Sequence, residues 1–300
     1  MGKKGKKAQA GKAKKPTPKD IGKRLDALAK KLEEELKGAD MFAPLQPTED
    51  DCPICLVRLS RMSHQSVFQM CCGKSICKAC FTKNIEFIAK QNNKNSGKTN
   101  KKPIVETCPL CRELEATSVG IVLRRLEVRA SQGDYGSWEI LAEIYELGMH
   151  GLRKDQLKAN DCWIRATELG SVNACANMAS SFRKGTGGIP VDMNKFALFD
   201  KVAVIRGDVT SRHNMGVREY ASGNHEDAIR HWKIAAEAGS QPSLNGLRDI
   251  FNSDGKFPGK EFISKGDLDN IYRAGHEAQE MVKSEEREKQ WEEKDRRWKC

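Results

Sequence analysis

The sequence predicts a mostly helical chain in which a small cysteine-rich unit is followed by a longer region of helical repeats. Two observations predict this fold class. Eight of the eleven cysteines fall within residues 52–111, and glycines recur at similar intervals beyond residue 130. A chain of 300 residues exceeds one comfortable domain, so two folded units with exposed tails fit both its length and its 38% share of hydrophobic residues.

The cysteines of the cysteine-rich unit are arranged in pairs. In order, these are Cys52 and Cys55, Cys71 and Cys72, Cys77 and Cys80, and Cys108 and Cys111. A C-x-x-C turn directs two thiolates to one point, and a tetrahedral zinc ion takes four sulfurs at about 2.3 Å, so four pairs predict two zinc ions. A disulfide framework and scattered buried thiols are the alternatives. The lysine-rich N-terminus lacks the apolar segment of a signal peptide, which favours an intracellular location, cytoplasmic or nuclear, and therefore zinc.

The order and gaps of these pairs resemble those of RING fingers, which are small α+β domains with two zinc ions. Cys52-Pro-Ile-Cys55 opens the motif, the run Cys72-Gly-Lys-Ser-Ile-Cys77-Lys-Ala-Cys80 matches the central turn, and Cys108-Pro-Leu-Cys111-Arg112 closes it. The resemblance implies that alternate pairs share a metal. Its implied ligands are Cys52, Cys55, Cys77 and Cys80 for the first zinc, and Cys71, Cys72, Cys108 and Cys111 for the second.

The second site departs from the family pattern at Lys74, which stands where the family usually has a histidine ligand. A protonated lysine has no lone pair, so it cannot replace that ligand. An all-cysteine variant of the family places its fourth ligand where Cys72 lies relative to Cys77, which makes Cys71 the third ligand. His64 is the alternative to one of the adjacent cysteines, although we prefer to interpret it as an ordinary exposed loop histidine.

The resemblance also implies a ubiquitin ligase, which docks a ubiquitin-conjugating enzyme and positions its thioester without forming a covalent intermediate of its own. Ile54 would provide an apolar contact to the conjugating enzyme, and Pro109 and Leu110 the second wall of that groove. Arg112 occupies the family's linchpin position, where a guanidinium bridges ubiquitin and the conjugating enzyme. A solvated surface arginine is the alternative.

Two features between the third and fourth pairs differ from many RING fingers. The groove of the family often contains a tryptophan there, and residues 81–107 have none. The candidates for an apolar surface in its place are Phe81, Ile85, Phe87 and Ile88. Residues 91–102 form a polar insertion that we expect to be a solvent loop.

The net charge of +11 is concentrated near the N-terminus, where residues 1–38 hold 13 Lys and Arg against 5 Asp and Glu. We expect the lysine-rich tail to be disordered. Its possible roles are nuclear import, contact with nucleic acid or an anionic surface, and simple solubility. An amphipathic helix follows, which we expect to pack on the RING or on a copy of itself; its stripe is Leu25, Leu28, Leu32 and Leu36.

The region beyond Arg112 contains an internal repeat. Glycines recur at intervals of 37, 37 and 32 residues, at Gly133, Gly170, Gly207 and Gly239. Each is followed eight residues later by an apolar residue, namely Leu141, Met178, Met215 and Leu247. This periodicity predicts a solenoid of helix pairs that bury their apolar stripes against one another. The detail resembles Sel1-like repeats, relatives of the tetratricopeptide class, with 174–185 as a first helix and 187–192 as the loop before a second.

The predicted organisation is a basic tail (1–19), an amphipathic helix (20–38), a linker (39–51), the RING (52–112), the repeat domain (113–280) and a charged extension (281–300). Isolated Cys162 and Cys175 fit small buried side chains. The sequence contains no run of about eighteen apolar residues that predicts a membrane span. It also lacks the phosphate loop and the H-E-x-x-H and G-x-S-x-G motifs of enzymes.

Two classes of function remain open. The first is a ubiquitin ligase whose RING recruits the conjugating enzyme and whose repeats bind the protein substrate, favoured by Ile54, Pro109 and Arg112. The second is a non-catalytic adaptor with purely structural zinc, favoured by Lys74 and the missing tryptophan. We favour the ligase, partly on analogy at the level of the fold.

Overall fold

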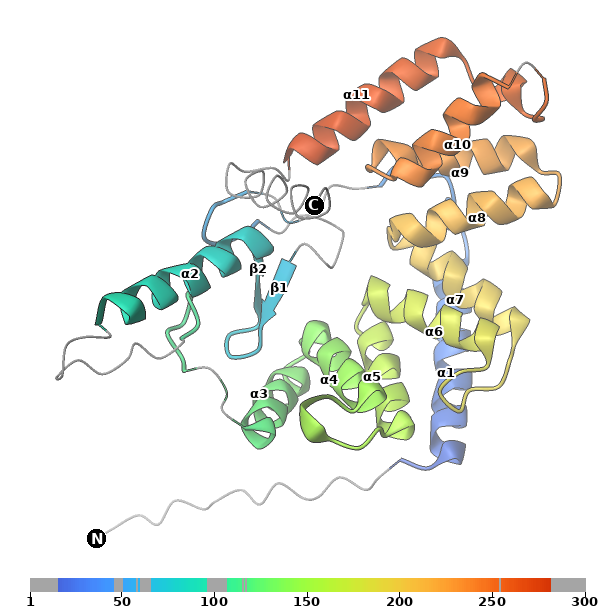
Figure 1. Cartoon of the computed structure of the whole chain (residues 1–300). Helices are drawn as coiled ribbons and strands as arrows, with labels where there is room; N and C mark the ends of the chain where they lie inside the picture. The colour runs from blue at the N-terminus through green and yellow to red at the C-terminus, as the bar shows by residue number, and fades with distance from the viewer. Residues whose placement is uncertain are drawn as a thin grey trace, which may run out of the picture.

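The computed structural model describes residues 16–45, 51–57, 59, 66–95, 107–114, 116, 118–253 and 255–281. His64, most of the basic tail and nearly all of the charged extension lie outside these residues. Within them, a small two-stranded unit with one long helix lies beside an array of stacked helices (Figure 1). The predicted fold class, mostly helical with a small cysteine-rich unit before a helical solenoid, is confirmed. None of the described helices is long and apolar enough to cross a bilayer.

The first helix, α1 (Pro18–Leu36), begins at a capping box. The Thr17 hydroxyl accepts a hydrogen bond from the Asp20 N–H, and the Asp20 carboxylate accepts one from the Thr17 N–H at 3.0 Å. Pro18 occupies the first turn, where a missing N–H costs nothing. The apolar stripe is buried along one face, at Ile21, Leu25, Leu28, Ala29 and Leu32.

The cysteine-rich unit contains strands β1 (Ser66–Gln69) and β2 (Lys74–Cys77), which pair antiparallel in the register Ser66 to Cys77. Helix α2 (Lys78–Asn95) follows directly. Residues 91–95, which we expected in a solvent loop, therefore belong to this helix. The sequence has no Gly or Pro between Lys78 and Asn95 to end the helix earlier. The remainder of that loop, 96–102, lies outside the described residues.

The repeat domain is built from short helices of similar length. They are α3 (Val119–Ser131), α4 (Tyr135–Leu147), α5 (Gln156–Glu168), α6 (Val172–Lys184), α7 (Met193–Ile205), α8 (Val209–Ala221), α9 (His225–Glu237), α10 (Gln241–Phe251) and α11 (Lys265–Met281), with 3-10 turns η2 (Met149–Gly151) and η3 (Lys260–Phe262). The pairs α4 with α5, α6 with α7, and α8 with α9 pack most closely. We call α4, α6, α8 and α10 the A helices, and α5, α7 and α9 the B helices.

The repeated glycines end one helix pair and lead into the next. All four have positive φ, from 92° to 99°, a conformation that glycine adopts without steric cost. The next residue is in each case the N-cap of an A helix and accepts a hydrogen bond from a backbone N–H of its first turn; these caps are Asp134, Ser171, Asp208 and Ser240. The recurring Gly-Asp and Gly-Ser pairs thus fix where each A helix begins.

The apolar positions that define the repeat are core residues. Leu141, Met178 and Leu247 are at most 1% exposed, and Met215 is 6% exposed. Cys162 and Cys175 are buried as expected, and the Cys175 thiol donates to the Phe199 carbonyl at 3.1 Å. The predicted solenoid alignment is therefore confirmed at these positions.

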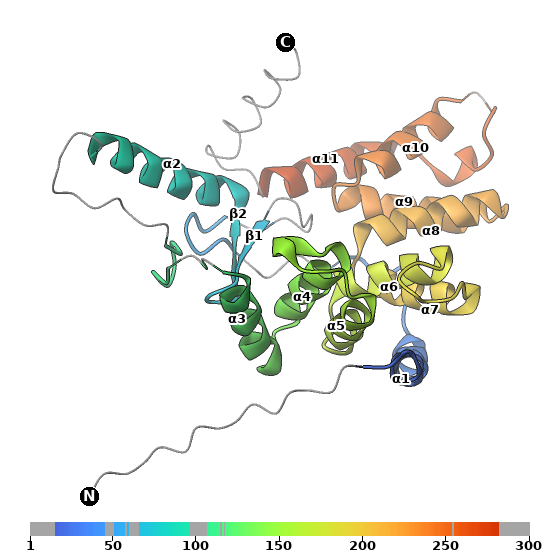
Figure 2. The same cartoon turned by 60° about the horizontal axis from the view of Figure 1, so that its bottom comes forward.

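The cysteine-rich unit packs against the first helices of the repeat domain (Figure 2). Phe68 of β1 contacts Gly136 at the start of α4. The Arg129 guanidinium of α3 lies so close to Gly73 that a Cβ there would collide with it, and it is paired with Asp134 at 3.3 Å. Only glycine at position 73 allows this close approach.

Candidate metal centres

Two C-x-x-C turns have matching backbone geometry. The Leu56 N–H donates to the Cys52 carbonyl at 2.8 Å, and the Arg112 N–H donates to the Cys108 carbonyl at 3.0 Å. Leu56 and Arg112 both have positive φ, at 57° and 62°. The same tight turn therefore directs both cysteines of each pair to one side.

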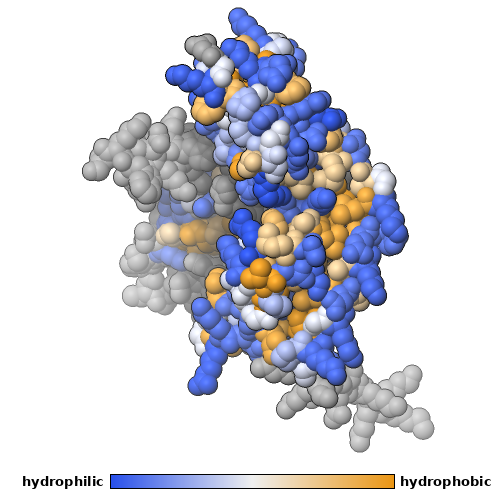
Figure 3. All heavy atoms as spheres, turned by 90° about the vertical axis from the view of Figure 1, so that its right-hand side faces the viewer, coloured by the Kyte–Doolittle hydropathy of each residue, from blue (hydrophilic) through white to orange (hydrophobic). Residues whose placement is uncertain are grey.

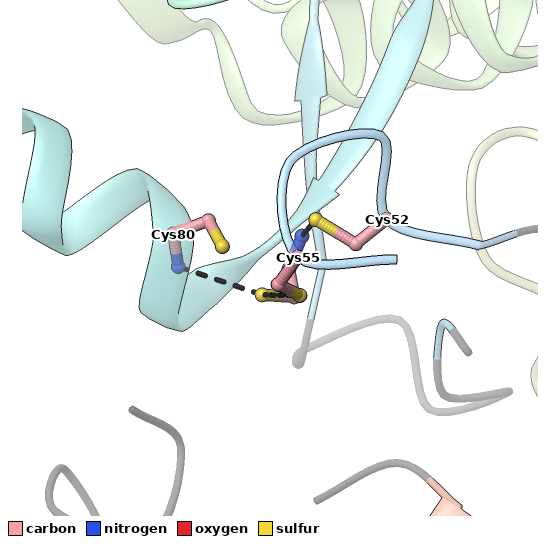
Figure 4. Close-up of side chains that lie close together, drawn as sticks. Cys52, Cys55 and Cys80 are labelled. Atoms are coloured by element: carbon pink, nitrogen blue, oxygen red, sulfur yellow. Dashed lines mark hydrogen bonds between the residues drawn. The ribbon is translucent and has the colours of Figure 1, made fainter. Parts of the chain in front are cut away.

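The first and third cysteine pairs meet in one group. The sulfur atoms of Cys52, Cys55, Cys77 and Cys80 all lie within 4.8 Å of one another. Sulfurs at 2.3 Å from a tetrahedral zinc ion lie about 3.8 Å apart, and the Cys55 and Cys77 sulfurs are 3.8 Å apart. Figure 4 shows Cys52 and Cys55 on one loop and Cys80 on the first turn of α2, around a common centre.

The second and fourth pairs form the other group, from Cys71, Cys72, Cys108 and Cys111. The Cys72 and Cys108 sulfurs are 3.9 Å apart, and those of Cys71 and Cys111 are 3.4 Å apart. The turn between β1 and β2 brings the adjacent cysteines to one point, because the Cys72 and Gly73 N–H groups both donate to the Gln69 carbonyl. Gly73 has φ of 68°, which completes this tight turn.

The protonation equilibria of the cysteines differ within each group. Burial raises the pKa of Cys52, but hydrogen bonds from the backbone N–H groups of Cys55 and Cys77 outweigh it and lower the value to about 7. The pKa of Cys108 is lowered for the same reason, by hydrogen bonds from the backbone N–H groups of Cys111 and Leu110. Burial raises the pKa of Cys55, Cys71, Cys72 and Cys80, and neighbouring thiols raise it further. Backbone N–H groups thus stabilise one thiolate in each group, that of Cys52 and that of Cys108.

These donor sets fit a metal that prefers four thiolates in a tetrahedron. Soft sulfur donors without carboxylates favour zinc over magnesium or calcium. Each group is able to hold one ion, which is compatible with two zinc ions per chain. Lys74 lies exposed in β2 and belongs to neither group.

The residues expected to contact a conjugating enzyme lie on two turns, Ile54 between ligands of the first group and the others on the Cys108–Cys111 turn of the second. Ile54 is 43% exposed, and Leu110 is partly buried against the apolar cluster that contains Cys52, Ile76 and Cys77. Pro109 is half-buried and Arg112 is exposed. Leu56, which is 77% exposed beside Ile54, was not among the residues predicted from the sequence. Its position after a C-x-x-C pair, equivalent to that of Arg112, was the available signal.

The apolar surface proposed to replace the missing tryptophan is smaller than expected. Phe87 is 59% exposed, but Ile88 is 6% exposed and belongs to the core. Phe81 packs against the cluster around the first cysteine group, and Ile85 is half-buried. A helix places residues 87 and 88 about 100° apart, and here Phe87 faces solvent while Ile88 faces the core.

The amphipathic helix α1 packs on the repeat domain rather than on the cysteine-rich unit or a second copy. Its buried stripe contacts the B helices α5 and α7. Ion pairs flank this contact: Lys195 with Asp26 at 2.7 Å, Arg206 with Glu35 at 2.7 Å, and Arg24 with both Asp161 and Glu168. One side of the solenoid is therefore covered by the chain itself.

The segment after α1 contacts the B helix α9 and the start of the A helix α8, to which Arg212 belongs. The Phe42 ring lies against His231 of α9, with centroids 4.7 Å apart, and under the Arg230 guanidinium at 3.8 Å. Arg212, only 1% exposed, donates to the Met41 carbonyl at 2.8 Å. Burial, followed by the Arg212 charge, lowers the pKa of His231 to about 4, so this histidine is neutral. Residues 18–42 thus form a strap across three B helices.

Comparisons with known proteins give distant likenesses only. No family model matches the chain, and no curated protein matches it. Among solved structures, a Sel1 repeat protein from Oxalobacter formigenes has 21% identity and a TM-score of 0.43, covering 54% of this chain and 65% of its own. The protective antigen c5321 of uropathogenic Escherichia coli, described as having an SLR fold, has 23% identity and a TM-score of 0.41 over 52% of this chain and 33% of its own. The chain thus spans less than two thirds of either structure.

The fold and the site together define the class: a helical-repeat protein that carries two groups of four cysteines suited to metal binding.

Proposed function

We propose that this chain is a RING-type ubiquitin ligase that binds two zinc ions. The zinc ions would hold the two C-x-x-C turns and the β1–β2 turn in place. The protein would then act by positioning, since no nucleophile of its own is needed for transfer from the conjugating enzyme.

The observation that carries this proposal is the alternation of the cysteine pairs. Pairs one and three form one group, and pairs two and four form the other. A string of independent zinc turns would instead combine neighbouring pairs, one with two and three with four. Alternation ties the four cysteine pairs into one unit, which is the arrangement that the RING resemblance implies.

The exposed surface beside the first group fits the docking of a conjugating enzyme. Ile54 and Leu56 project apolar area from the first turn, and Leu110 of the last turn packs against the same cluster. Apolar contacts of this kind supply the affinity, because each buried aliphatic side chain contributes about 1.5–3 kcal/mol. Arg112 follows directly, exposed and on a backbone fixed by the Cys108 turn, where several donors are available to ubiquitin.

The A helices provide the surface for a protein substrate. The strap of residues 18–42 covers the B helices, whereas side chains of the A helices stay exposed, among them Glu143, Asn177, Asn214 and Val217. The exposed amide side chains on this face suit an extended peptide, whose backbone groups pair with amides.

The second candidate is an adaptor with structural zinc only, and one observation favours it. Lys74 replaces the usual histidine ligand and lies exposed beside Gly73, so the second group lacks the family's ordinary composition. In this alternative the cysteine-rich unit anchors the repeats and transfers nothing.

An auto-ubiquitination assay tests the proposal. The full chain with zinc would be incubated with ubiquitin, activating enzyme and a panel of conjugating enzymes. We expect ubiquitin conjugates with at least one of them, and their loss in Ile54→Ala. Leu169→Ala is a matched control, because Leu169 is 44% exposed but lies at the end of α5, in the repeat domain. Absence of conjugates across the panel, with two zinc ions bound, would leave the adaptor.

A further inference from the structure

The loops at the ends of two A helices combine exposed apolar and basic side chains. Leu147 and Met149 follow α4 at 60% and 43% exposure, and Val191 and Met193 precede α7 at 61% and 55%. Between and beside them lie four exposed basic residues: Arg153, Lys154, Arg183 and Lys184. We call these eight residues the basic loop edge.

The two loops are held together as one surface. The Asn160 side-chain amide donates to the Gly187 carbonyl at 2.9 Å, and Gln156 contacts the same glycine. Each loop follows a helix that ends at a glycine with φ of 68°, Gly148 and Gly185. The apolar side chains therefore project from a fixed edge of the solenoid. Figure 3 shows one face of the molecule, on which hydrophobic residues lie exposed among hydrophilic ones.

The acidic residues of these two loops, Asp155 and Asp192, are half-buried and fewer than the four exposed basic residues. Asp155 accepts from the Lys158 N–H, and Asp192 accepts from the Asn194 and Lys195 N–H groups, so both serve as helix caps. Arg183 also lies 5.8 Å from the Phe196 ring centroid, a contact that leaves its charge in place. The exposed charges on these loops are therefore basic.

Helix α1 begins at the same edge. α1 runs parallel to α7, because Asp26 pairs with Lys195 in the first turn of α7 and Glu35 with Arg206 after its last turn. The beginning of α1 therefore lies where α5 and α7 begin, as the lower right of Figure 1 shows. Residues 1–15, which precede it, contain seven lysines.

From this placement, we propose that the basic loop edge docks on the surface of an anionic lipid bilayer. Basic side chains near an anionic membrane gain from its negative surface potential, and apolar side chains at loop tips enter the boundary between headgroups and acyl chains. Phosphate contacts of a nucleic acid would use the basic residues but leave Leu147, Met149, Val191 and Met193 in water. The apolar residues thus favour a bilayer over a nucleic acid.

Vesicle sedimentation with the full, zinc-loaded chain tests this proposal. The probes are vesicles of phosphatidylcholine alone and vesicles with about 30% phosphatidylserine. We expect binding to the anionic vesicles only, weakened by high salt because salt screens the charges. Failure to sediment with the anionic vesicles at low salt would overturn the proposal.

Two double variants locate the binding surface. Leu147→Gln with Val191→Gln removes apolar contact, and Arg153→Glu with Lys184→Glu reverses charge; each should lower the partition constant about tenfold. Leu169→Gln and Lys201→Glu are exposed controls elsewhere on the solenoid and should bind like the original chain. Circular dichroism and zinc content would show that all variants fold.

Two further measurements separate the edge from the tail and from nucleic acid. A chain without residues 2–15 should still bind anionic vesicles and should still respond to the loop substitutions. If only the deletion matters, the tail alone binds and the proposal is wrong. Two results together would assign the edge to nucleic acid instead. A single-stranded RNA would bind tightly with no loss of affinity on changing Leu147 and Val191, and vesicle binding would not respond to the loop substitutions.

Discussion

Leu56 and Arg112 occupy the same place in two matching turns. Each follows the second cysteine of a C-x-x-C pair, donates its N–H to the carbonyl of the first cysteine, and has positive φ. Non-glycine residues adopt a positive φ only at a cost in free energy. The hydrogen bond of each turn offsets part of this cost, and the turn in return positions two cysteine sulfurs. One turn presents an apolar side chain and the other a cation.

The geometry of the cysteine groups predicts two zinc ions per chain. Native mass spectrometry should give a mass increase for two ions, and strong chelation should unfold the cysteine-rich unit, because structural zinc contributes roughly 10–16 kcal/mol in small fingers. The repeat helices contain none of the eight ligands, so most helical circular dichroism should persist. A stoichiometry of one or none would contradict the two-site account.

Single cysteine variants should each empty one site. Cys55→Ser should release the first ion and Cys71→Ser the second, since each removes one of four donors. Cys162→Ser, in α5, is the control and should keep both ions. If the Cys71→Ser variant also keeps two zinc ions, another ligand such as His64 completes the second site.

The strap predicts that α1 stabilises the repeat domain. Leu32 is 0% exposed between α1 and the B helices, so Leu32→Ala should lower the free energy of unfolding by about 2–5 kcal/mol in urea denaturation. Glu33→Ala, at an exposed position of the same helix, should change it by less than about 0.5 kcal/mol. Equal stability of the two variants would mean that α1 does not dock.

Glu139 predicts a dependence of stability on pH. Burial, and then the charges of Glu143 and Asp134, raise its pKa above the ordinary 4.5, despite hydrogen bonds from Ser171 and Asn173. A raised folded-state pKa stabilises the fold below the unfolded value and loses that contribution as pH rises through the folded value. Glu139→Gln should therefore raise the melting temperature at pH 7 and leave it nearly unchanged at pH 4, whereas exposed Glu33→Gln should leave it nearly unchanged at both. A lower melting temperature at pH 7 would contradict this.

The sequence predicted those parts of the fold that depend on local spacing. C-x-x-C pairs fix two sulfurs within one turn, so the pairs themselves could be read from the spacing, whereas the choice of which pairs share a metal came from the resemblance to RING fingers. The Gly-Asp and Gly-Ser pairs fix helix starts, so the core positions of the solenoid followed by counting. Both signals are short in range and need no knowledge of the tertiary contacts.

Features that depend on distant contacts were not predictable in the same way. The apolar stripe of α1 predicts that one face of the helix is buried, but it does not identify the helices that cover this face. Ion pairs such as Glu35 with Arg206, which are 171 residues apart, help to place α1 on the B helices. Similarly, the polar composition of residues 91–95 suits a loop, yet helix α2 extends through them. Ile88 faces the core because of the helical phase of α2, which composition does not reveal.

Discharge of ubiquitin from a preloaded conjugating enzyme tests the central claim most directly. With free lysine as acceptor, the chain should accelerate discharge, and Arg112→Ala should slow it about tenfold or more while leaving binding of the conjugating enzyme nearly intact, since about 1.4 kcal/mol of lost transition-state stabilisation gives that factor. Ile54→Ala should weaken the binding itself. Both variants must retain two zinc ions. If the original chain fails to accelerate discharge from every conjugating enzyme tested, and neither substitution has an effect, the ligase account is wrong. The adaptor is then the function that is left.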